Sequence, residues 1–534
     1  MIKNPILPGF HPDPSILRVG DDYYIATSTF EWFPGVEIHH SRDLKHWELS
    51  ARPLSRRSQI DMAGNPDSGG VWAPDISYHQ GTYYLVYTDV KHHSGIFRDT
   101  HNYLVTAPSI TGPWSEPVYL NSTGFDPSLF FDDDGRVYLL NMTNDCRPWN
   151  NRFSGISLQE FSLKEMKLKG SPQIIFPGTE LGFTEGPHLY RLNGYYYLLT
   201  AEGGASYNHA VTMARSESLR GPYTVDPMNP MLSSRDTPEL ELQRAGHADI
   251  VQTRNGDWYM VHLCGRPLPG TRNCILGRET AIQKVFWDES GWLRLTTGGR
   301  APVMETEEAG LPEWIPDKTE PDCDDFDSPV LGSRYQTLRI PFEKGIMSLS
   351  ERPGYLRLRG QESLSSLFRQ SLLATRILSF RCRMETRIEF APYTFRQMAG
   401  LICYYDTMRY HYLYITHSES AGRILAIQSC KGGDYYFPLR ETEGLEDFVQ
   451  LPGEESVGLR AEIDGETLRF FYSHGAGENW QQIGPDLDSK VLSDEYMQRN
   501  SFTGAFSGLC CQDLSGERLH ADFDYFEYRD VKQD

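Results

Sequence analysis

A short motif recurs five times between residues 13 and 250, and no other feature of the sequence constrains the fold as strongly. In each copy, proline or alanine is followed by a polar residue and then by isoleucine or leucine: Asp13-Pro14-Ser15-Ile16, Ala73-Pro74-Asp75-Ile76, Asp126-Pro127-Ser128-Leu129, Gly186-Pro187-His188-Leu189 and His247-Ala248-Asp249-Ile250. The copies begin at residues 13, 73, 126, 186 and 247, so they are 60, 53, 60 and 61 residues apart. A repeat of this length predicts one supersecondary unit per copy.

Each copy leads into a turn and then an aromatic strand. In the first copy the turn is Gly20-Asp21-Asp22 and the strand begins at Tyr23-Tyr24. Such runs between Gly, Asn and Asp predict hairpins, and helical periodicity is scarce. The sequence therefore predicts an all-β chain that contains a five-bladed β-propeller. A solenoid is the alternative, but only a propeller explains why every unit begins near a polar residue, since the first strand of each blade lines a central channel.

A second domain follows the repeat, which ends near Trp292. Residues 300–325 are rich in Pro, Glu and Asp, and strand-like segments then continue without the repeat. About 210 residues of such segments fit a β-sandwich. We therefore predict a propeller over 1–300, a linker over 301–324 and a concanavalin-like β-sandwich over 325–534.

The composition excludes several classes of function. Of 534 residues, 51 are Lys or Arg and 72 are Asp or Glu, which gives a net charge of -21 and a poor surface for nucleic acid or anionic lipid. No apolar run approaches the ~18 residues of a membrane helix, and no secretory signal is visible at the N-terminus. The nine cysteines form no CxxC pair, so we expect free thiols in a reducing cytoplasm.

Carboxylates at three blade starts point to a reaction. Asp13 and Asp126 open the first and third copies, Glu185 precedes the fourth, and His247 opens the fifth, so a propeller brings all four to one cavity. Two facing carboxylates are the minimum for hydrolysing a glycosidic bond, one protonated and one ionised. A third would raise the pKa of the acid. The alternative, that each Asp only caps a strand or turn before Pro, does not account for three acids at equivalent positions.

Other polar motifs are of lower rank. Asp75 and Asp249 lie two positions along their strands and share a face with the strand start. The run 132–135 (Asp-Asp-Asp-Gly) lacks the ligand spacing of a calcium loop and is predicted to be a hairpin turn. The tandem pairs His39-His40 and His92-His93 are expected on the surface or in turns.

Long stretches of the chain resemble glycoside hydrolase family 43, in particular its β-xylosidase branch with a C-terminal β-sandwich. The matching stretches span nearly the whole chain and include residues 4–16, 26–35 (Ala-Thr-Ser-Thr-Phe-Glu-Trp-Phe-Pro-Gly), 70–75, 124–130, 184–188, 245–248, 276–281, 335–341 and 502–506.

The resemblance implies an inverting, exo-acting hydrolase that releases xylose from the non-reducing ends of β-1,4-xylo-oligosaccharides. In it, Asp13 would be the general base, Glu185 the general acid, and Asp126 the residue that orients Glu185 and tunes its pKa. The resemblance also implies roles in substrate binding, with Arg278 on the terminal sugar's hydroxyls, His247 beneath the sugar, and Phe506, in preference to Phe502, closing the site from the second domain. Phe30 and Trp72 lie near the first two blade starts and would offer rings to sugars.

Some properties are expected from these observations, and others stay open. We expect no required metal or cofactor, although calcium near His247 occurs in some relatives. We also expect a homodimer or homotetramer in the cytoplasm. The alternatives are α-L-arabinofuranosidase as the main or a second activity, and a non-catalytic sugar-binding propeller or scaffold, for which matched carboxylates are not needed.

Overall fold

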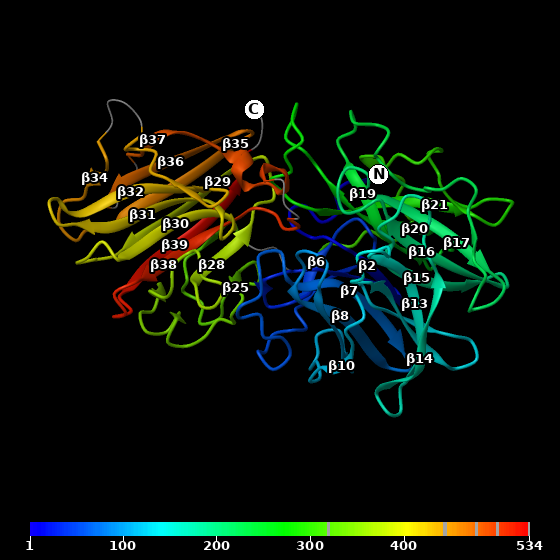
Figure 1. The fold of residues 1–534 in the computed structure, drawn as a ribbon. Helices are drawn as coiled ribbons and strands as arrows, with labels where there is room; N and C mark the ends of the chain where they lie inside the picture. The colour runs from blue at the N-terminus through cyan, green and yellow to red at the C-terminus, as the bar shows by residue number, and fades with distance from the viewer. Residues whose placement is uncertain (318–320, 442–445, 476–478, 498–500, 532–534) are drawn as a thin grey trace. The chain divides into compact units, whose positions relative to one another are not determined.

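The structure is a computed structural model that describes residues 1–317, 321–441, 446–475, 479–497 and 501–531 (Figure 1). Within these ranges the regular structure is almost entirely β, with two short 3-10 helices, η1 (Ser489–Leu492) and η2 (Asp494–Tyr496). None of the helices among these residues is long and apolar enough to cross a membrane.

Five antiparallel four-stranded sheets form the N-terminal part, blue to green in Figure 1. We call these sheets blades and number them in chain order. Blade 1 consists of β2 (Ser15–Val19), β3 (Asp22–Thr27), β5 (Glu37–Ser41) and β6 (Glu48–Ala51), and blade 2 of β7 (Gly70–His79), β8 (Thr82–His92), β9 (Asp99–Ala107) and β10 (Val118–Asn121). Blade 3 consists of β11 (Ser128–Phe131), β12 (Val137–Asn144), β13 (Phe153–Ser162) and β14 (Lys167–Phe176), blade 4 of β15 (Glu185–Leu192), β16 (Tyr195–Glu202), β17 (Ala210–Ser216) and β18 (Thr224–Val225), and blade 5 of β19 (Gln243–Gln252), β20 (Trp258–Gly265), β21 (Glu279–Trp287) and β22 (Leu293–Leu295).

The first strands of the blades close a ring. β2 contacts β7, β7 contacts β11, β11 contacts β15, β15 contacts β19, and β19 contacts β2. This arrangement confirms the predicted five-bladed propeller and puts the recurring motif at its centre. The predicted turns are also confirmed: β2 and β3 pair up to Val19 and Asp22, and Gly135 N–H donates to the Asp132 carbonyl at 3.0 Å between β11 and β12.

The chain order within a blade explains which loops meet the motif. Each sheet is an antiparallel meander, so the connection between the second and third strands returns to the end where the first strand begins. We call this connection the second loop of its blade. Side chains from the second loops therefore share the end of the propeller that carries the blade-start residues. A short strand, β4 (Trp32–Phe33), lies in the second loop of blade 1.

The C-terminal part consists of two antiparallel sheets, yellow-green to red in Figure 1, which confirms the predicted β-sandwich. One sheet has the order β26 (Met347–Ser348), β27 (Leu356–Arg359), β39 (His520–Asp530), β29 (Arg381–Glu389), β35 (Val457–Asp464), β36 (Thr467–His474) and β37 (Gln481–Asp488), with β24 (Cys323–Asp324) beside β39. The other has the order β33 (Asp434–Tyr436), β32 (Gly422–Lys431), β31 (Arg409–Ser418), β30 (Gln397–Asp406), β38 (Phe506–Asp513), β28 (Ser371–Arg376) and β25 (Gln336–Leu338), with β34 (Val449–Gln450) beside β32.

Alternation in the sequence accounts for the sandwich core. Along β29, Cys382, Met384, Thr386 and Ile388 are buried while the residues between them are more exposed, as the two-residue period of a strand requires. The side chains of Cys382, Met384 and Ile388 join a large apolar cluster from both sheets.

The chain divides into two compact units. The first comprises Met1–Ile60, Gly69–Arg266 and Arg278–Lys318, and the short strands β1 (Ile2–Lys3) and β23 (Glu305–Thr306) pair within it. The second comprises Asp61–Ser68, Pro267–Gly277 and Thr319–Asp534. The segment 267–277 is most of the second loop of blade 5, and its Leu268, Ile275 and Leu276 lie in the apolar core of the sandwich. Two segments that lie between propeller strands in the sequence, 61–68 and 267–277, thus belong to the second unit.

Candidate active site

Three blade-start residues share an unusual backbone conformation. Asp13, Asp126 and His247 have φ angles of 55°, 55° and 45°, in the left-handed region that residues other than glycine rarely adopt. Each stands at or near the point where the chain enters the first strand of its blade. Backbone strain of this kind is typical of functional sites, where the surrounding structure holds a side chain in one direction.

The Asp13 carboxylate is fixed by three neighbours. Ser28 Oγ donates to its Oδ2 at 2.7 Å, and Arg278 Nη1 donates to its Oδ1 at 3.0 Å. His247 Nδ1 lies 3.7 Å from the same Oδ1. The side chain is buried, with 5% of its surface exposed. Hydrogen bonds from a hydroxyl and a guanidinium hold the carboxylate in one orientation.

Arg278 connects Asp13 with an aromatic ring. Its guanidinium lies 5.1 Å from the centre of the Phe30 ring, and its backbone carbonyl accepts a hydrogen bond from His11 N–H at 2.9 Å. The residue is buried and directly follows the segment 267–277 in the chain. Phe30 in turn lies 5.8 Å from Trp72, centre to centre. The predicted binding residues Arg278, Phe30 and Trp72 therefore form one contiguous group next to Asp13.

Glu185 and Asp126 are held in an environment that disfavours their charge. Burial of the carboxyl raises the pKa of Glu185 to about 7; the charge of Asp13 acts in the same direction, whereas Arg98 and Arg278 oppose it. Burial also raises the pKa of Asp126 well above its usual range, and the charges of Glu185 and Asp13 add to this. Gly186 N–H donates to Asp126 Oδ2 at 3.0 Å, which ties Asp126 to the residue that follows Glu185.

The sequence did not single out Arg98, which lies in the second loop of blade 2. Its guanidinium stands 5.2 Å from the Phe125 ring and 5.1 Å from the Phe153 ring, and its charge lowers the pKa of Glu185. Burial lowers the pKa of Arg98 itself, and the charge of Glu185 counteracts this. No motif surrounds Arg98 in the sequence; its position at the end of a second loop is the one signal that could have indicated it.

Two histidines lie close to the acids, and only one was predicted. Burial lowers the pKa of His247 to about 4, so its ring is neutral near pH 7. The ring packs against Gly186, where an added Cβ would stand 3.0 Å from Nε2. His209, from the second loop of blade 4, packs in the same way against Gly246, and burial lowers its pKa well below the usual value. The glycines beside Glu185 and His247 thus leave room for these rings.

A second polar layer lies along the first strands. Ser15 Oγ donates to Asp75 Oδ1 at 3.1 Å and stands 3.2 Å from Asp249 Oδ2, which also accepts from Ile16 N–H at 2.7 Å. His188 Nδ1 lies 3.6 Å from Asp75 Oδ1. Burial raises the pKa of Asp75 to about 6. Asp75 and Asp249 both belong to this layer, and hydrogen bonds within the protein occupy their oxygens.

In the described part of the chain, two groups of side chains have the spacing to hold a metal ion. One is Asp75, His188 and Asp249, and the other is His11, Glu37 and His39. Neither group includes His247, and the expectation that no metal is required stays a prediction.

The placement predicted for the tandem histidines, on the surface or in turns, is wrong for His39, which lies inside a strand, whereas His93 lies in the loop after β8. His39 and His93 are buried, each with 7% of its surface exposed. His39 lies in β5, where the two-residue period sends one of two adjacent side chains inward.

Phe506 belongs to the sandwich unit, at the start of β38. It is buried, and the Arg376 guanidinium lies 5.5 Å from the centre of its ring. Phe502, the less favoured candidate, donates through its N–H to Ser68 Oγ at 3.0 Å within the same unit. The role expected of Phe506 stays a prediction.

Hydrolysis of a glycoside requires two carboxyl groups in unlike environments, and Glu185 and Asp13 meet that requirement. Residues 2–293 match Glycosyl hydrolases family 43, and residues 323–529 match the Beta xylosidase C-terminal Concanavalin A-like domain. The chain belongs to glycosyl hydrolase family 43 and is a glycoside hydrolase.

Relatives of known name span the whole chain. It is 49% identical to a beta-xylosidase of Bacillus subtilis (strain 168), over 99% of each protein. It is also 49% identical to xylosidase/arabinosidase 43B of Humicola insolens, over 99% of this chain and 98% of the other. Among solved structures, xylan beta-1,4-xylosidase from Bacillus halodurans C-125 is 55% identical, with a TM-score of 0.97 over 99% of this chain and 100% of the other.

Proposed function

We propose that this protein is an inverting, exo-acting β-xylosidase that releases xylose from the non-reducing ends of β-1,4-xylo-oligosaccharides. One observation carries the proposal: a carboxyl whose pKa is raised to about 7, Glu185, shares a site with a carboxylate held by an arginine, Asp13. Hydrolysis of a glycoside needs such a pair, because one group must give a proton while the other takes one. Relatives with xylosidase names over nearly the full chain support the choice of sugar.

In the proposed reaction, Asp13 is the general base. It removes a proton from a water molecule, and the oxygen of that water attacks the anomeric carbon of the terminal xylose. Glu185 is the general acid and gives its proton to the glycosidic oxygen as the bond to the leaving sugar breaks. The water attacks the face opposite to the leaving group, so a β-linkage yields α-xylose.

The other site residues act on these two. Asp126 is a positioning residue: its Oδ2 accepts a hydrogen bond from Gly186 N–H, which fixes the start of β15 and thereby the direction of Glu185. Arg278 orients Asp13 and binds hydroxyls of the terminal sugar. Phe30 and Trp72 offer apolar surface to that sugar, and neutral His247 supports Asp13 from beneath. Phe506 is proposed to help close the site.

The test is an early-time proton NMR record of purified enzyme with xylobiose. We expect the α-anomer of xylose to appear before mutarotation. If β-xylose appears first, one of the acids is a nucleophile and the role of Asp13 as base is wrong. If xylobiose is not cleaved, the substrate assignment is wrong.

A second candidate activity is the release of α-L-arabinofuranose. Xylosidase/arabinosidase 43B favours it at 49% identity, and so does, at 34% identity, the non-reducing end alpha-L-arabinofuranosidase BoGH43B of Bacteroides ovatus. Both sugars can present similar hydroxyls to Arg278. Rates on matched aryl β-xyloside and aryl α-arabinofuranoside substrates would rank the two activities.

Three further properties belong to this proposal. No metal is required, so a chelator should leave the rate on xylobiose unchanged and added calcium should not raise it. The protein forms a homodimer or homotetramer, which sedimentation equilibrium would measure. It acts in the cytoplasm, which the distribution of activity between cell and culture fluid would test.

A further inference from the structure

A continuous row of aromatic rings runs between the two proposed catalytic carboxylates. Successive ring centres are 5.8 Å apart from Phe30 to Trp72, 5.3 Å from Trp72 to Phe125, 6.0 Å from Phe125 to Phe153 and 5.1 Å from Phe153 to Phe183. We call these five residues the aromatic row. All of them belong to the propeller unit. Edge-to-face and tilted contacts at these distances are favourable, so the row is a defined structure rather than a chance cluster.

The two ends of the row differ in exposure. Phe30, at the end beside Asp13 and Arg278, has 2% of its surface exposed, whereas Phe183 has 49% exposed. Phe125 and Phe153 between them are buried, and the Arg98 guanidinium lies against both rings. Phe183 is therefore the one member of the row that offers a large part of its ring to a ligand.

Phe183 is fixed in place beside the proposed acid. It stands two residues before Glu185 in a left-handed conformation, with a φ of 54°. Its ring lies over Gly204 in the second loop of blade 4, where an added Cβ would be in ordinary contact at 3.7 Å. The ring is thus held between Phe153 on one blade and a glycine on the next.

The chemistry of the acid decides which sugar this ring would meet. A general acid must lie within hydrogen-bond reach of the glycosidic oxygen, and that oxygen departs with the sugar on the reducing-end side. The buried end of the row adjoins Asp13, where the terminal xylose is attacked. The exposed end stands two residues before Glu185 in the chain, and Arg98, which lies against the neighbouring Phe153 ring, acts on the charge of Glu185. This end of the row therefore belongs to the side of the departing sugar.

We propose that Phe183 is a stacking platform for the sugar on the reducing-end side of the cleaved bond. This inference rests on the proposed function, because it takes Glu185 as the acid. It predicts that Phe183 sets the preference for oligosaccharides over substrates whose leaving group has no ring.

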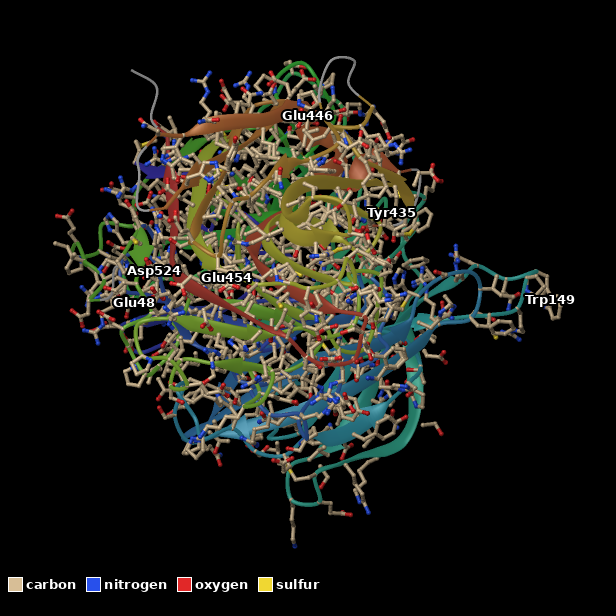
Figure 2. All side chains as sticks on the ribbon, turned by 90° about the vertical axis from the view of Figure 1, so that its left-hand side faces the viewer. Glu48, Trp149, Tyr435, Glu446, Glu454 and Asp524 are labelled. Atoms are coloured by element: carbon tan, nitrogen blue, oxygen red, sulfur yellow. The ribbon has the colours of Figure 1, made fainter. Side chains whose placement is uncertain are left out.

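Another exposed aromatic residue is less suited to this role. Trp149 has 78% of its surface exposed and stands at the tip of a projecting loop (Figure 2). Asp145 in that loop is paired with Arg147 and bonded by Asn150, so the loop has its own local scaffold. Among the described residues, no ring contact joins Trp149 to the aromatic row.

The experiment compares Phe183→Ala with the parent on xylobiose and on β-xylosyl fluoride. Loss of the ring should lower kcat/KM for xylobiose about three- to tenfold, the amount expected for one aromatic contact. The value for β-xylosyl fluoride, whose leaving group has no ring to stack, should stay within about twofold. Phe183→Tyr keeps the ring and should retain the parent's preference. Phe286→Ala removes a ring of similar exposure (46%) from β21, outside the row, and should change neither substrate.

Each other outcome overturns the proposal. Equal losses on both substrates would mean that the ring supports Glu185 rather than the leaving sugar. Unchanged values on both would mean that the ring meets no sugar, and a lower solution mass of Phe183→Ala with unchanged kcat/KM would make it a contact between copies of the chain. If the parent protein cleaves β-xylosyl fluoride but not xylobiose, the proposed role of Phe183 is wrong, whereas the proposed hydrolysis of β-xylosides is still supported. A parent that cleaves neither refutes the proposed function itself.

Discussion

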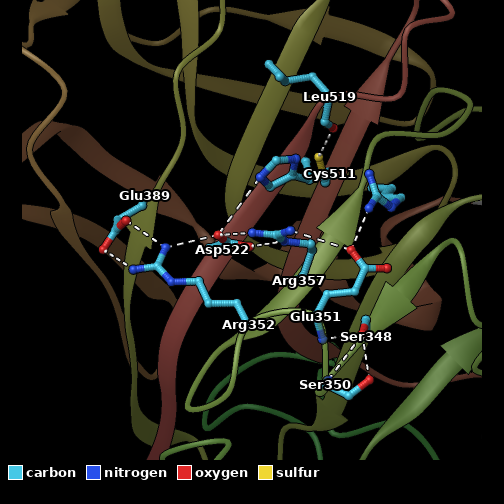
Figure 3. Close-up of polar contacts among 11 residues, drawn as sticks. Ser348, Ser350, Glu351, Arg352, Arg357, Glu389, Cys511, Leu519 and Asp522 are labelled. Carbon is cyan, nitrogen blue, oxygen red and sulfur yellow. Dashed lines mark hydrogen bonds and ion pairs between the residues drawn. The ribbon is translucent and has the colours of Figure 1, made fainter.

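Buried carboxylates in the two units meet opposite surroundings. In the sandwich, Asp522 accepts from Arg357 Nε at 2.7 Å and Nη2 at 2.8 Å and from Arg352 Nη1 at 3.0 Å (Figure 3). Burial alone would raise the pKa of Asp522, but these hydrogen bonds outweigh it and the pKa is lowered. The network continues from Arg352 to Glu389, so each charge has a partner.

In the propeller, Asp126 is about as little exposed as Asp522, at 6% against 4%, but its bonded donor is not a cation. Among the described residues its bonded donor is the Gly186 N–H, and its charged neighbours include Glu185 and Asp13. Burial and these two charges raise its pKa. The comparison shows that low exposure alone does not fix the direction of a carboxyl's pKa shift, because bonded arginines lower the pKa of Asp522, whereas burial and neighbouring carboxylates raise that of Asp126. A carboxylate that is hydrogen-bonded to cations stabilises the fold. A buried carboxyl group without bonded cations has a raised pKa and is available for proton transfer.

The largest effect should follow from changing Glu185, the proposed acid, whose pKa is raised like that of Asp126. Glu185→Gln cannot donate a proton, so kcat on xylobiose should fall about 10²- to 10⁴-fold. A dinitrophenyl xyloside, whose leaving group needs little protonation, should lose far less. Steady-state rates on both substrates make the test, with Asp522→Asn as a control that removes a buried carboxylate elsewhere. Equal losses on the two substrates would contradict the assignment of Glu185 as the acid.

Changing Asp522, the carboxylate that is bonded to two arginines, should affect stability instead of activity. Asp522→Asn leaves Arg352 and Arg357 without their shared charge, and the free energy of unfolding should drop by about 2 kcal/mol near pH 7, with kcat unchanged. The pKa of Asp522 is lowered from 3.8, so the stability it contributes is present above that value and is lost as pH falls through its lower folded pKa.

Urea unfolding of parent and Asp522→Asn at neutral and strongly acidic pH measures this. The difference between the two proteins should shrink in acid. A difference that is the same at both pH values would mean that packing, rather than charge, accounts for the loss. Glu389→Gln, which removes one outer member of the same network, should cost less, because Glu389 is more exposed than Asp522.

The repeat made the propeller and its acids predictable. Because the motif recurs at nearly constant spacing, residues at equivalent positions, such as Asp13 and Asp126, had to meet once the ring closed. The same argument reached Asp75 and Asp249 through the two-residue period of a strand. These predictions did not depend on the conformation of the loops, because all four residues lie in the recurring motif.

The rest of the site lies where the sequence does not repeat. Arg98 and His209 come from second loops, whose lengths and residues differ from blade to blade, so no spacing marks them. The segment 267–277 joins the sandwich core through Leu268 and Ile275, which look like ordinary loop residues until both sheets exist. His39 was misplaced because a tandem pair gives no sign of which member points inward.

The smallest effect concerns Arg98, a cation from the second loop of blade 2 whose charge acts on Glu185. Its charge lowers the pKa of Glu185, so Arg98→Met should raise that pKa above the parent's value of about 7. Glu185 must be protonated to act, and activity is lost as pH rises through its pKa. The alkaline limb of kcat/KM should therefore move to higher pH, while the value at acidic pH changes by less than about fivefold. Arg136→Met, which removes an exposed arginine paired with Asp134, should leave the limb in place. An unmoved limb in Arg98→Met, or one at lower pH, would show that Arg98 does not act on Glu185 through its charge.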